Sequence, residues 1–293
     1  MSVRPVSLLL TGAARVAPAS RATVQKALLR RVYEVISRRF GDDGTAFLNY
    51  GYAPPGRPLQ DLDLTPEEAQ EDRFGIQLYN LVASGAELAG RDVLEVGCGR
   101  GGGTAFVARH HRPRRLVGLD LAKRAIAHCR RTHHLPGLEF VRGDAEDLPF
   151  PDESFDVVLN VESSHCYPDM ERFLAEVRRV LRPGGTLLLA DLRHTDLKGE
   201  RPVAVPQDDV PALRRQLAAS GMEIVEEEDI TAGVVRALEL DSERRRAMVE
   251  SSAPPGLREQ LMDFAAVKGT NLFRAFSERD VTYLRFVLRK PSG

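Results

Sequence analysis

Residues 93–103 read VLEVGCGRGGG, and this glycine-rich stretch decides the fold. Its apolar start predicts the end of a β-strand, and its glycines predict a tight turn that opens a helix. Glycines also let the main chain approach a bound ligand closely. Gly97, Gly99 and Gly102 satisfy the spacing G-x-G-x-x-G, and Asp120 follows about twenty residues later, as a dinucleotide site requires. The loop alone does not distinguish NAD from S-adenosylmethionine (SAM).

Around this loop, the sequence alternates short apolar runs with helical patterns. Such alternation is typical of βαβ units on a parallel sheet. Strands are expected at residues 92–96, 115–119, 138–142, 155–160 and 186–191. Helices are expected after Gly101, at residues 123–131, and at residues 170–181, where the turn Arg182-Pro183-Gly184-Gly185 follows. The predicted fold is a doubly wound, Rossmann-like α/β core.

The rest of the chain predicts two strands separated by a long helical stretch. A helix is expected at residues 209–220, and strands at residues 222–228 and 282–288. Residues 232–279 have helical periodicity, broken at Pro254-Pro255-Gly256. The expected organisation is an N-terminal helical lid segment (1–85), the cofactor-binding core (86–230), a helical lid insertion (231–279) and the final core strand (280–293).

The composition favours one soluble catalytic domain. The 41 basic and 42 acidic residues give a net charge of -1, which disfavours a nucleic-acid partner. Cys98, Cys129 and Cys166 form no C-x-x-C pair, which indicates reduced intracellular thiols. The apolar runs are too short to span a bilayer. We expect a cytoplasmic monomer or homodimer with no stable membrane insertion.

The first forty residues are strongly basic, with Glu34 as their one acid. A transit peptide shares this bias, but the apolar residues at helical spacing favour an amphipathic helix with a basic, solvated face. A further hypothesis is that this helix docks an acidic carrier protein bearing the substrate, and ordinary solvated charge is the alternative. The residues concerned are Arg30, Arg31, Arg38 and Arg39.

Three features distinguish the two cofactors. Glu95 stands two residues before the first glycine, where a dinucleotide-binding strand is more often apolar. Asp144 adds an acid at the end of the third expected strand, and open α/β sheets bind ligands at such carboxyl ends. The run FDVVLN at residues 155–160 leads into a helix and the turn LRPGG at residues 181–185.

With the glycine loop, these features resemble, in order, the motif series of class I SAM-dependent methyltransferases. The resemblance implies that SAM is the cofactor and that the main chain at Gly97 and Gly99 meets its methionyl part. It implies that Asp120 accepts the ribose hydroxyls, and that Asp144 with Ala145 borders the adenine. Asn160 would lie by the methionyl end through its main chain. The cofactor-binding residues expected are Tyr50, Glu95, Gly97, Cys98, Gly99, Asp120, Leu121, Asp144, Ala145 and Asn160.

Other stretches are similar to a narrower group, the phthiotriol and phenolphthiocerol dimycocerosate methyltransferases, and in part to bacterial polyketide and sugar O-methyltransferases. They are FLNYGY (47–52), NVESSHCYP (160–168), ADLR (190–193), AVKGT (266–270) and YLRFVL (283–288). The resemblance implies O-methylation of a hydroxyl on a small molecule of lipid, polyketide or glycoside type. It does not identify the acceptor of this chain. It would place Tyr50 near SAM, and packing within the lid is the alternative.

His165 and Asp191 are the candidate catalytic residues. A hydroxyl acceptor loses its proton during transfer, and histidine, with an unperturbed pKa of about 6.5, suits that role. His165 follows the fourth strand and Asp191 ends the fifth, so the usual strand order predicts a base beside an orienting carboxylate. A loop histidine is the alternative. No metal is expected, because the sequence offers no second and third ligand beside Asp191.

Other functions stay open from the sequence. The cofactor motifs describe SAM and not the acceptor, so C- or N-methylation is the nearest alternative. An NAD-dependent oxidoreductase is disfavoured by Glu95 and by the late position of the glycine loop. A third alternative is a protein that keeps SAM without transferring its methyl group, since fold does not settle function.

Overall fold

The computed structural model describes residues 47, 49–66, 68–196, 208–253 and 255–292. The expected basic N-terminal helix, with its four candidate docking arginines, lies outside the described residues. Within the described ranges, no helix is long and apolar enough to cross a bilayer.

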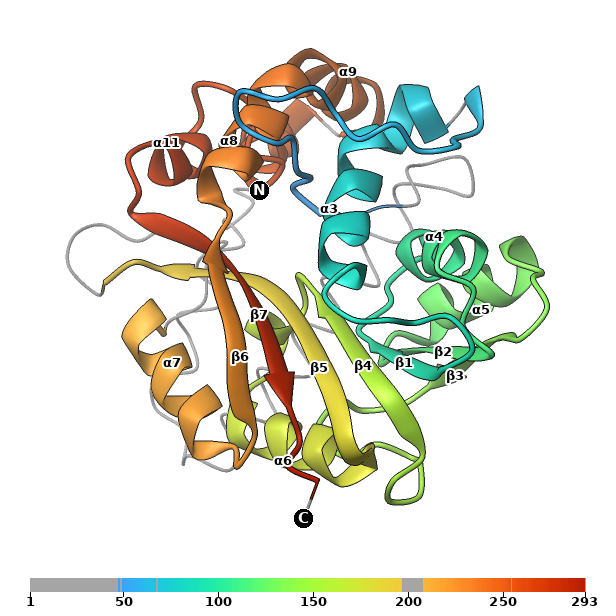
Figure 1. Ribbon diagram of the computed structural model, residues 1–293. Helices are drawn as coiled ribbons and strands as arrows, with labels where there is room; N and C mark the ends of the chain where they lie inside the picture. Colours follow the sequence, from blue (N-terminus) through green and yellow to red (C-terminus); the bar gives the residue numbers. More distant parts are fainter. Residues whose placement is uncertain (1–46, 48, 67, 197–207, 254, 293) are drawn as a thin grey trace.

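A seven-stranded mixed sheet lies at the centre of the molecule (Figure 1). Its strands are β1 (Asp92–Val96), β2 (Arg115–Asp120), β3 (Leu138–Arg142), β4 (Phe155–Val161), β5 (Leu181–His194), β6 (Glu223–Asp229) and β7 (Val281–Arg289). They lie in the order β3-β2-β1-β4-β5-β7-β6, and β7 runs antiparallel to both of its neighbours. This topology confirms the doubly wound, Rossmann-like core, and every strand expected from the sequence is present.

Strand β5 begins earlier than the sequence predicts. Leu181 already pairs with Phe155 of β4, and the main chain of Gly184 and Gly185 exchanges hydrogen bonds of 3.0 and 2.8 Å with Lys290. Gly184 has a φ of +75°, a conformation that glycine adopts without steric cost, so the chain bends there and stays in the sheet. The turn LRPGG, which we expected to separate helix from strand, is therefore part of β5.

Helices cover both faces of the sheet and one of its ends. They are α3 (Arg73–Ala83), α4 (Gly102–His110), α5 (Lys123–Thr132), α6 (Met170–Val180), α7 (Val210–Ala219), α8 (Thr231–Leu240), α9 (Ser242–Ser252), α10 (Arg258–Phe264) and α11 (Asn271–Ser277). A single turn of π-helix, η2 (Glu68–Asp72), precedes α3, and a 3-10 turn, η3 (Ser164–Cys166), follows β4. Asp169 and Asp209 cap α6 and α7 by accepting hydrogen bonds from main-chain N–H groups at 2.9 and 2.8 Å.

Alternate strand residues enter two apolar cores, one on each face of the sheet. In β5, Leu188 and Ala190 pack with α3, α4, α8 and α11, whereas Leu187 and Leu189 pack with α6 and α7. Because both faces are buried, the central strands appear in the sequence as nearly continuous apolar runs. For this reason the strand positions predicted from the sequence agree closely with those in the structure.

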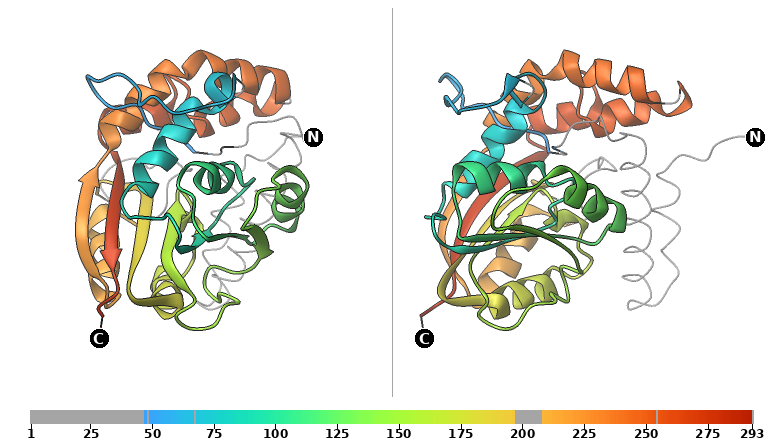
Figure 2. Two further views of the ribbon diagram at one scale, coloured as in Figure 1. Left: turned by 45° about the vertical axis from the view of Figure 1, so that its right-hand side comes forward. Right: turned by 90° about the vertical axis from the view of Figure 1, so that its right-hand side faces the viewer.

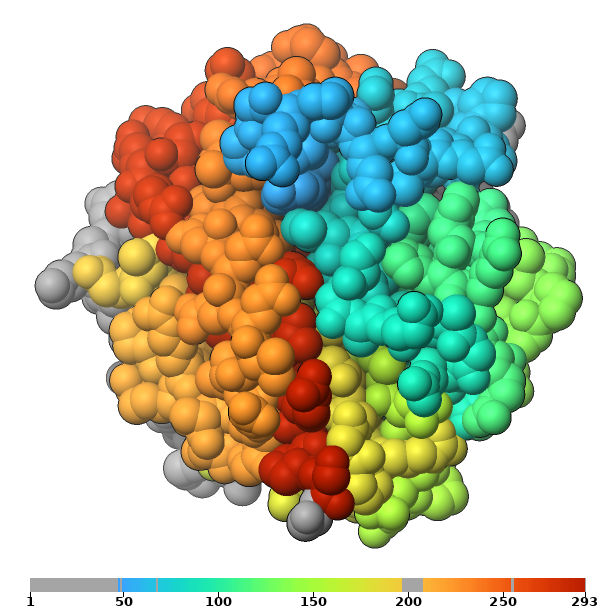
Figure 3. All heavy atoms as spheres, in the orientation of Figure 1, coloured from blue at the N-terminus to red at the C-terminus, as the bar shows by residue number. Residues whose placement is uncertain are grey.

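Helices α8 to α11 form a layer beyond the carboxyl ends of β4 and β5 (Figure 2). They lie between β6 and β7 in the chain, at the position expected for the helical insertion. The segment around residues 50–60 rests against them (Figure 3): Ala53 N donates to Gly233 O at 3.0 Å, and Arg236 donates to Arg57 O at 2.8 Å.

Arg245 of α9 joins this segment to the insertion. Its side chain is only 8% exposed, and its Nε donates to Oδ2 of Asp241 at 3.0 Å. Its Nη2 donates to the carbonyl oxygens of Asn49 and Tyr50, both at 3.1 Å, and its Nη1 donates to Ala265 O at 3.2 Å. One buried guanidinium therefore satisfies acceptors from three segments that are distant in the sequence.

Replacing Arg245 by methionine is expected to lower the free energy of unfolding by about 2–3 kcal/mol, because several buried acceptors lose their donor. Arg244 also pairs with Asp241, at 2.7 and 2.6 Å, so that carboxylate keeps one partner and the loss stays moderate. Urea unfolding measures the change. Arg246→Met, on the same helix but only half-buried, is the matched control. Equal effects of the two substitutions would contradict this role for Arg245.

Candidate active site

The glycine loop lies between the end of β1 and the start of α4, beside the end of β2. The main-chain N–H groups of Gly97 and Cys98 both donate to Leu119 O, at 2.8 and 3.0 Å, which holds the loop against β2. Gly97 has a φ of +82°, and a Cβ atom there would meet Ser163 Oγ at 2.2 Å. Glycine is therefore required at this position by both conformation and space.

Asp120, at the end of β2, contacts the glycine loop. Its Oδ2 accepts from Gly99 N at 2.9 Å, and its Oδ1 accepts from Ala122 N at 2.8 Å. Burial raises the pKa of this carboxyl, although both main-chain hydrogen bonds oppose the shift. Each oxygen keeps a lone pair free of main-chain donors, so the carboxylate is able to accept further hydrogen bonds from the cavity.

A cavity of about 240 Å³ runs from the glycine loop to the helical insertion. Nine of the residues expected from the sequence line it: Tyr50, Gly97, Cys98, Gly99, Asp120, Leu121, Asp144, Ala145 and His165. Glu95, Asn160 and Asp191 do not line the cavity and lie behind residues that do.

Glu95 points from β1 toward α3 rather than into the cavity. It is fully buried, and its Oε1 accepts a hydrogen bond of 2.7 Å from the hydroxyl of Tyr79, which itself lines the cavity. Burial raises the pKa of Glu95 to about 7. Glu95, which the sequence placed among the cofactor-binding residues, therefore supports the cavity wall from behind through Tyr79.

Asn160 at the end of β4 organises the turn beside the glycine loop. Its side-chain nitrogen lies 2.9 Å from Val96 O, 2.8 Å from Ser163 Oγ and 3.0 Å from Tyr167 Oη. Ser163 and Tyr167 line the cavity, and their hydroxyls lie 2.8 Å apart. Asn160 therefore faces the end of β1 and braces two residues of the cavity wall.

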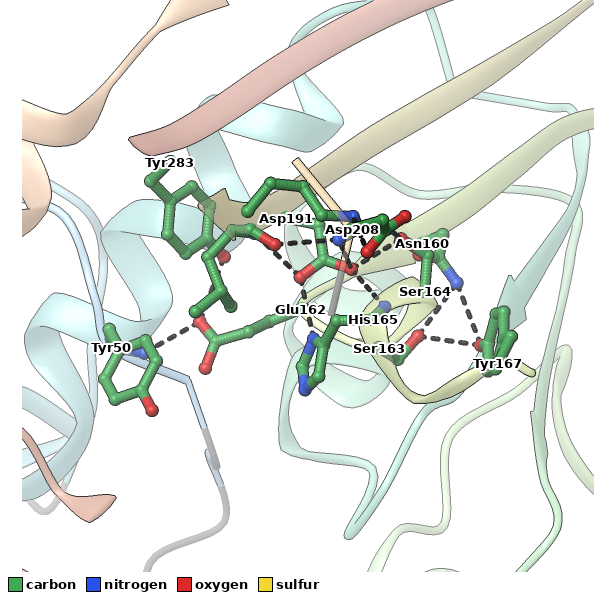
Figure 4. Close-up of polar contacts among 12 residues, drawn as sticks. Tyr50, Asn160, Glu162, Ser163, Ser164, His165, Tyr167, Asp191, Asp208 and Tyr283 are labelled. Carbon is green, nitrogen blue, oxygen red and sulfur yellow. Dashed lines mark hydrogen bonds and ion pairs between the residues drawn. The ribbon is translucent and has the colours of Figure 1, made fainter. Parts of the chain in front are cut away.

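His165 and Asp191 face each other at the carboxyl ends of β4 and β5 (Figure 4). His165 Nδ1 lies 2.8 Å from Asp191 Oδ1, and the main-chain N–H of His165 donates to Asp191 Oδ2 at 2.7 Å. An ionised carboxylate only accepts hydrogen bonds, so Nδ1 must carry the proton of the imidazole. In the neutral ring, Nε2 then carries the lone pair that is able to accept a proton.

The two groups shift each other's pKa. Burial alone would raise the pKa of Asp191, but His165 and Arg193 hold it well below its usual value. Burial alone would lower the pKa of His165, but Cys166 and the Asp191 carboxylate raise it well above the usual value. The pair therefore keeps Asp191 ionised and makes the imidazole a stronger base than a free histidine.

A buried arginine completes this pair, and its role was not predicted from the sequence. Arg193 is 1% exposed, and its Nη1 lies 3.3 Å from Oδ2 of Asp191. Its Nη2 donates to Ser164 Oγ at 3.1 Å, and that hydroxyl donates to Asp191 Oδ2 at 2.5 Å. Arg193 also pairs with Asp208 at 3.3 Å. These contacts fix Asp191 so that its Oδ1 is presented to His165.

The helical insertion forms one wall of the cavity, and the residues of that wall were not predicted from the sequence. The side chains concerned come from α9 and α10 and comprise two arginines and four apolar residues: Arg244, Arg245, Met248, Val249, Leu261 and Phe264. Tyr50 joins the core to this wall, because its hydroxyl donates to Phe264 O at 3.2 Å. Glu162, which follows β4 directly, also lines the cavity.

Potential metal ligands are not clustered in this site. Among the described residues, no three His, Cys, Asp or Glu side chains are placed to hold one ion. The carboxylates of Asp120 and Asp191 are instead occupied by main-chain N–H groups and by His165.

The family and the curated relatives that match this chain by sequence are methyltransferases. The family described as "Methyltransferase domain" matches residues 94–189. The chain is 40% identical over 274 residues to the phthiotriol/phenolphthiotriol dimycocerosates methyltransferase of Mycobacterium tuberculosis, covering 94% of this chain and 96% of that protein. It is 41% identical over 264 residues to the fatty-acid O-methyltransferase of Mycolicibacterium smegmatis, covering 89% of each.

Solved structures share the fold at lower identity. The cyclopropane synthase MmaA2 from Mycobacterium tuberculosis superposes with a TM-score of 0.67 at 18% identity. The match covers 87% of this chain and 98% of the synthase. At that identity, the likeness concerns the arrangement of strands and helices.

Proposed function

This chain belongs to the SAM-dependent methyltransferase family that includes the phthiotriol/phenolphthiotriol dimycocerosates methyltransferases, and we propose that it methylates a hydroxyl oxygen of a lipid-type or polyketide-type small molecule. The observation that carries the proposal is the His165–Asp191 pair at the edge of the cavity. A hydroxyl acceptor needs a base, and an amine acceptor needs no strong one. The pair therefore favours oxygen over nitrogen as the methylated atom.

The residues at the glycine loop fit SAM, the methyl donor of this family. Asp120 offers a buried carboxylate in the cavity wall, which suits the two ribose hydroxyls of an adenosyl group. Gly97 and Gly99 bring main chain to the cavity without side chains, and Asp144 with Ala145 lies further along the same wall. Tyr50 and His165 line the same cavity, where the methionyl end and the acceptor are expected to meet.

The chemistry divides between the donor and the protein. SAM supplies a methyl group already activated on a positively charged sulfur, so the protein has to hold the acceptor oxygen in line and remove its proton. Asp191 fixes the imidazole of His165 through Nδ1, and Nε2 takes the proton of the acceptor hydroxyl. Arg193 and Ser164 keep Asp191 ionised and correctly turned.

We extend the proposal to the organisation of the chain, with residues 231–279 acting as a lid over the core. Two observations support this role. Apolar side chains of α9 and α10 line the cavity, and Arg245 donates hydrogen bonds to the carbonyl oxygens of Asn49 and Tyr50. A wall of this kind suits an acceptor with a long apolar part, which agrees with the lipid substrates named for the relatives.

Product analysis tests the proposed function directly. The purified protein is incubated with SAM carrying an isotopically labelled methyl group and with long-chain alcohols, and NMR locates the label in the product. A methyl ether is the expected product. Label attached to carbon or nitrogen, or SAM binding without any transfer, would replace the proposal by one of the alternatives that the cofactor motifs leave open.

The pH dependence of turnover is expected to follow the protonation of His165. A protonated imidazole accepts no proton, so kcat/KM falls as the pH drops through the raised pKa of His165, above the usual value of about 6.5. Asp191→Asn removes a charge that raises this pKa, so the acidic limb of the profile should move to lower pH. An unshifted limb in the variant would show that another group controls it.

A further inference from the structure

Glu162 holds a strained position beside the proposed base. It follows β4, and its side chain lines the same cavity as that of His165. Its main chain has a φ of +50°, in the left-handed region that residues other than glycine rarely adopt. Such conformations cost free energy, and they cluster at functional sites, where the surrounding structure holds them in place.

The two oxygens of the Glu162 carboxylate have different surroundings. Oε2 accepts hydrogen bonds from Tyr50 N and from the hydroxyl of Tyr283, each at 2.9 Å. Figure 4 shows the other oxygen, Oε1, turned away from both of these donors. The two bonds therefore fix the carboxylate through Oε2. Because Glu162 and His165 line the same cavity, Oε1 is the oxygen of Glu162 that a molecule bound beside the proposed base could reach.

Desolvation of this carboxylate is only partly compensated by the protein. Burial raises the pKa of Glu162 to about 7, although Tyr50 N, the charge of His165 and the Tyr283 hydroxyl all lower it. A buried carboxylate gains from each further hydrogen-bond donor. A donor placed at Oε1 by a bound molecule would supply what the protein itself leaves out.

We propose that Glu162 binds the acceptor, with Oε1 accepting a hydrogen bond from a second hydroxyl next to the one that gives its proton to His165. This inference rests on the proposed O-methylation. Two anchored hydroxyls fix the direction of the reacting oxygen, whereas a single hydroxyl leaves the acceptor free to turn. The substrate class selected by this site is therefore a molecule with neighbouring hydroxyl groups.

A purely structural role makes a different prediction. Glu162 also links Tyr50 to β7 through Tyr283, so its loss would loosen the cavity for every acceptor alike. Glu162→Gln removes the charge with almost no change in shape. Tyr283→Phe removes one of the bonds to Oε2 and leaves Oε1 in place, which makes it the matched control.

The test compares diols with single alcohols of the same chain length. The probes are decane-1,2-diol, decane-1,3-diol, decan-1-ol and decan-2-ol, and the measured quantity is kcat/KM with SAM. The wild type should prefer one of the diols by about ten- to a hundredfold, the range of a hydrogen bond to a charged group. In Glu162→Gln this preference should shrink to within about threefold, while Tyr283→Phe should retain it.

Binding gives a second readout that needs no turnover. Calorimetry with the S-adenosylhomocysteine complex should show weaker binding of the preferred diol to Glu162→Gln than to Tyr283→Phe. Equal losses for diols and single alcohols, equal losses in the two variants, or no diol preference in the wild type would overturn the role of Glu162. If no alcohol is methylated but diol binding still depends on Glu162, the proposed function fails, whereas the binding of neighbouring hydroxyls by Glu162 is retained.

Discussion

Replacing His165 by alanine is expected to lower kcat for a hydroxyl acceptor by about two to four orders of magnitude, the range of general-base catalysis. The reason is geometric: Asp191 holds Nδ1 at 2.8 Å, so Nε2 is the group left to take a proton. The loop and Asp120 stay intact in this variant. Its affinity for SAM, measured by calorimetry, should therefore change by less than about threefold.

Two comparisons sharpen this experiment. His134→Ala removes an exposed histidine and should leave turnover unchanged. A fatty acid, the acceptor named for one relative, offers a carboxylate with no proton to remove, so any methylation of palmitate should survive in His165→Ala. Near wild-type turnover of an alcohol by His165→Ala would exclude His165 as the base.

Replacing Asp120 by alanine is expected to weaken SAM binding by at least about a hundredfold, because hydrogen bonds to a charged group contribute about 1.5–3 kcal/mol each. The carboxylate is proposed to accept the ribose hydroxyls while it holds Gly99 N at 2.9 Å and Ala122 N at 2.8 Å. The substitution therefore removes ligand contacts and loosens the loop together. Titration with SAM and with S-adenosylhomocysteine measures the combined loss of affinity.

Asp152→Ala is the control for this variant, since its side chain is 74% exposed and lies away from the loop. Titration with NADH completes the design. Wild-type protein that binds NADH, and neither SAM nor S-adenosylhomocysteine, would contradict the assignment of the cofactor.

Much of the fold and part of the site follow from local pattern. The strand before the glycine loop is buried on both faces, so its apolar run and the glycines after it mark the end of β1 unambiguously. The sheet order then determines which strand ends meet. His165 follows β4 and Asp191 lies near the end of the adjacent strand β5, so their pairing was predictable from the strand order.

The remaining site residues depend on contacts between distant segments. Glu95 shares the face of β1 that Val93 presents to α3, and its partner Tyr79 comes from that helix, so no pattern within β1 identifies the contact. In the sequence, Arg193 resembles any solvent-exposed charged residue near the end of a strand. Its burial against Asp191 is a result of the tertiary fold. The cavity wall of α9 and α10 depends likewise on which side of each helix faces the core, and that is determined by contacts with distant segments.

The connection between β6 and β7 has a consequence for how this enzyme could be re-engineered. The two strands are antiparallel neighbours, paired as far as Asp229 and Leu284, so α8 to α11 amount to an elaborated hairpin loop. The entropic cost of closing a loop grows only slowly with its length. Exchanging this loop between relatives would therefore replace the cavity wall formed by α9 and α10 as one unit, provided that the contacts of Arg245 with residues 49 and 50 are kept.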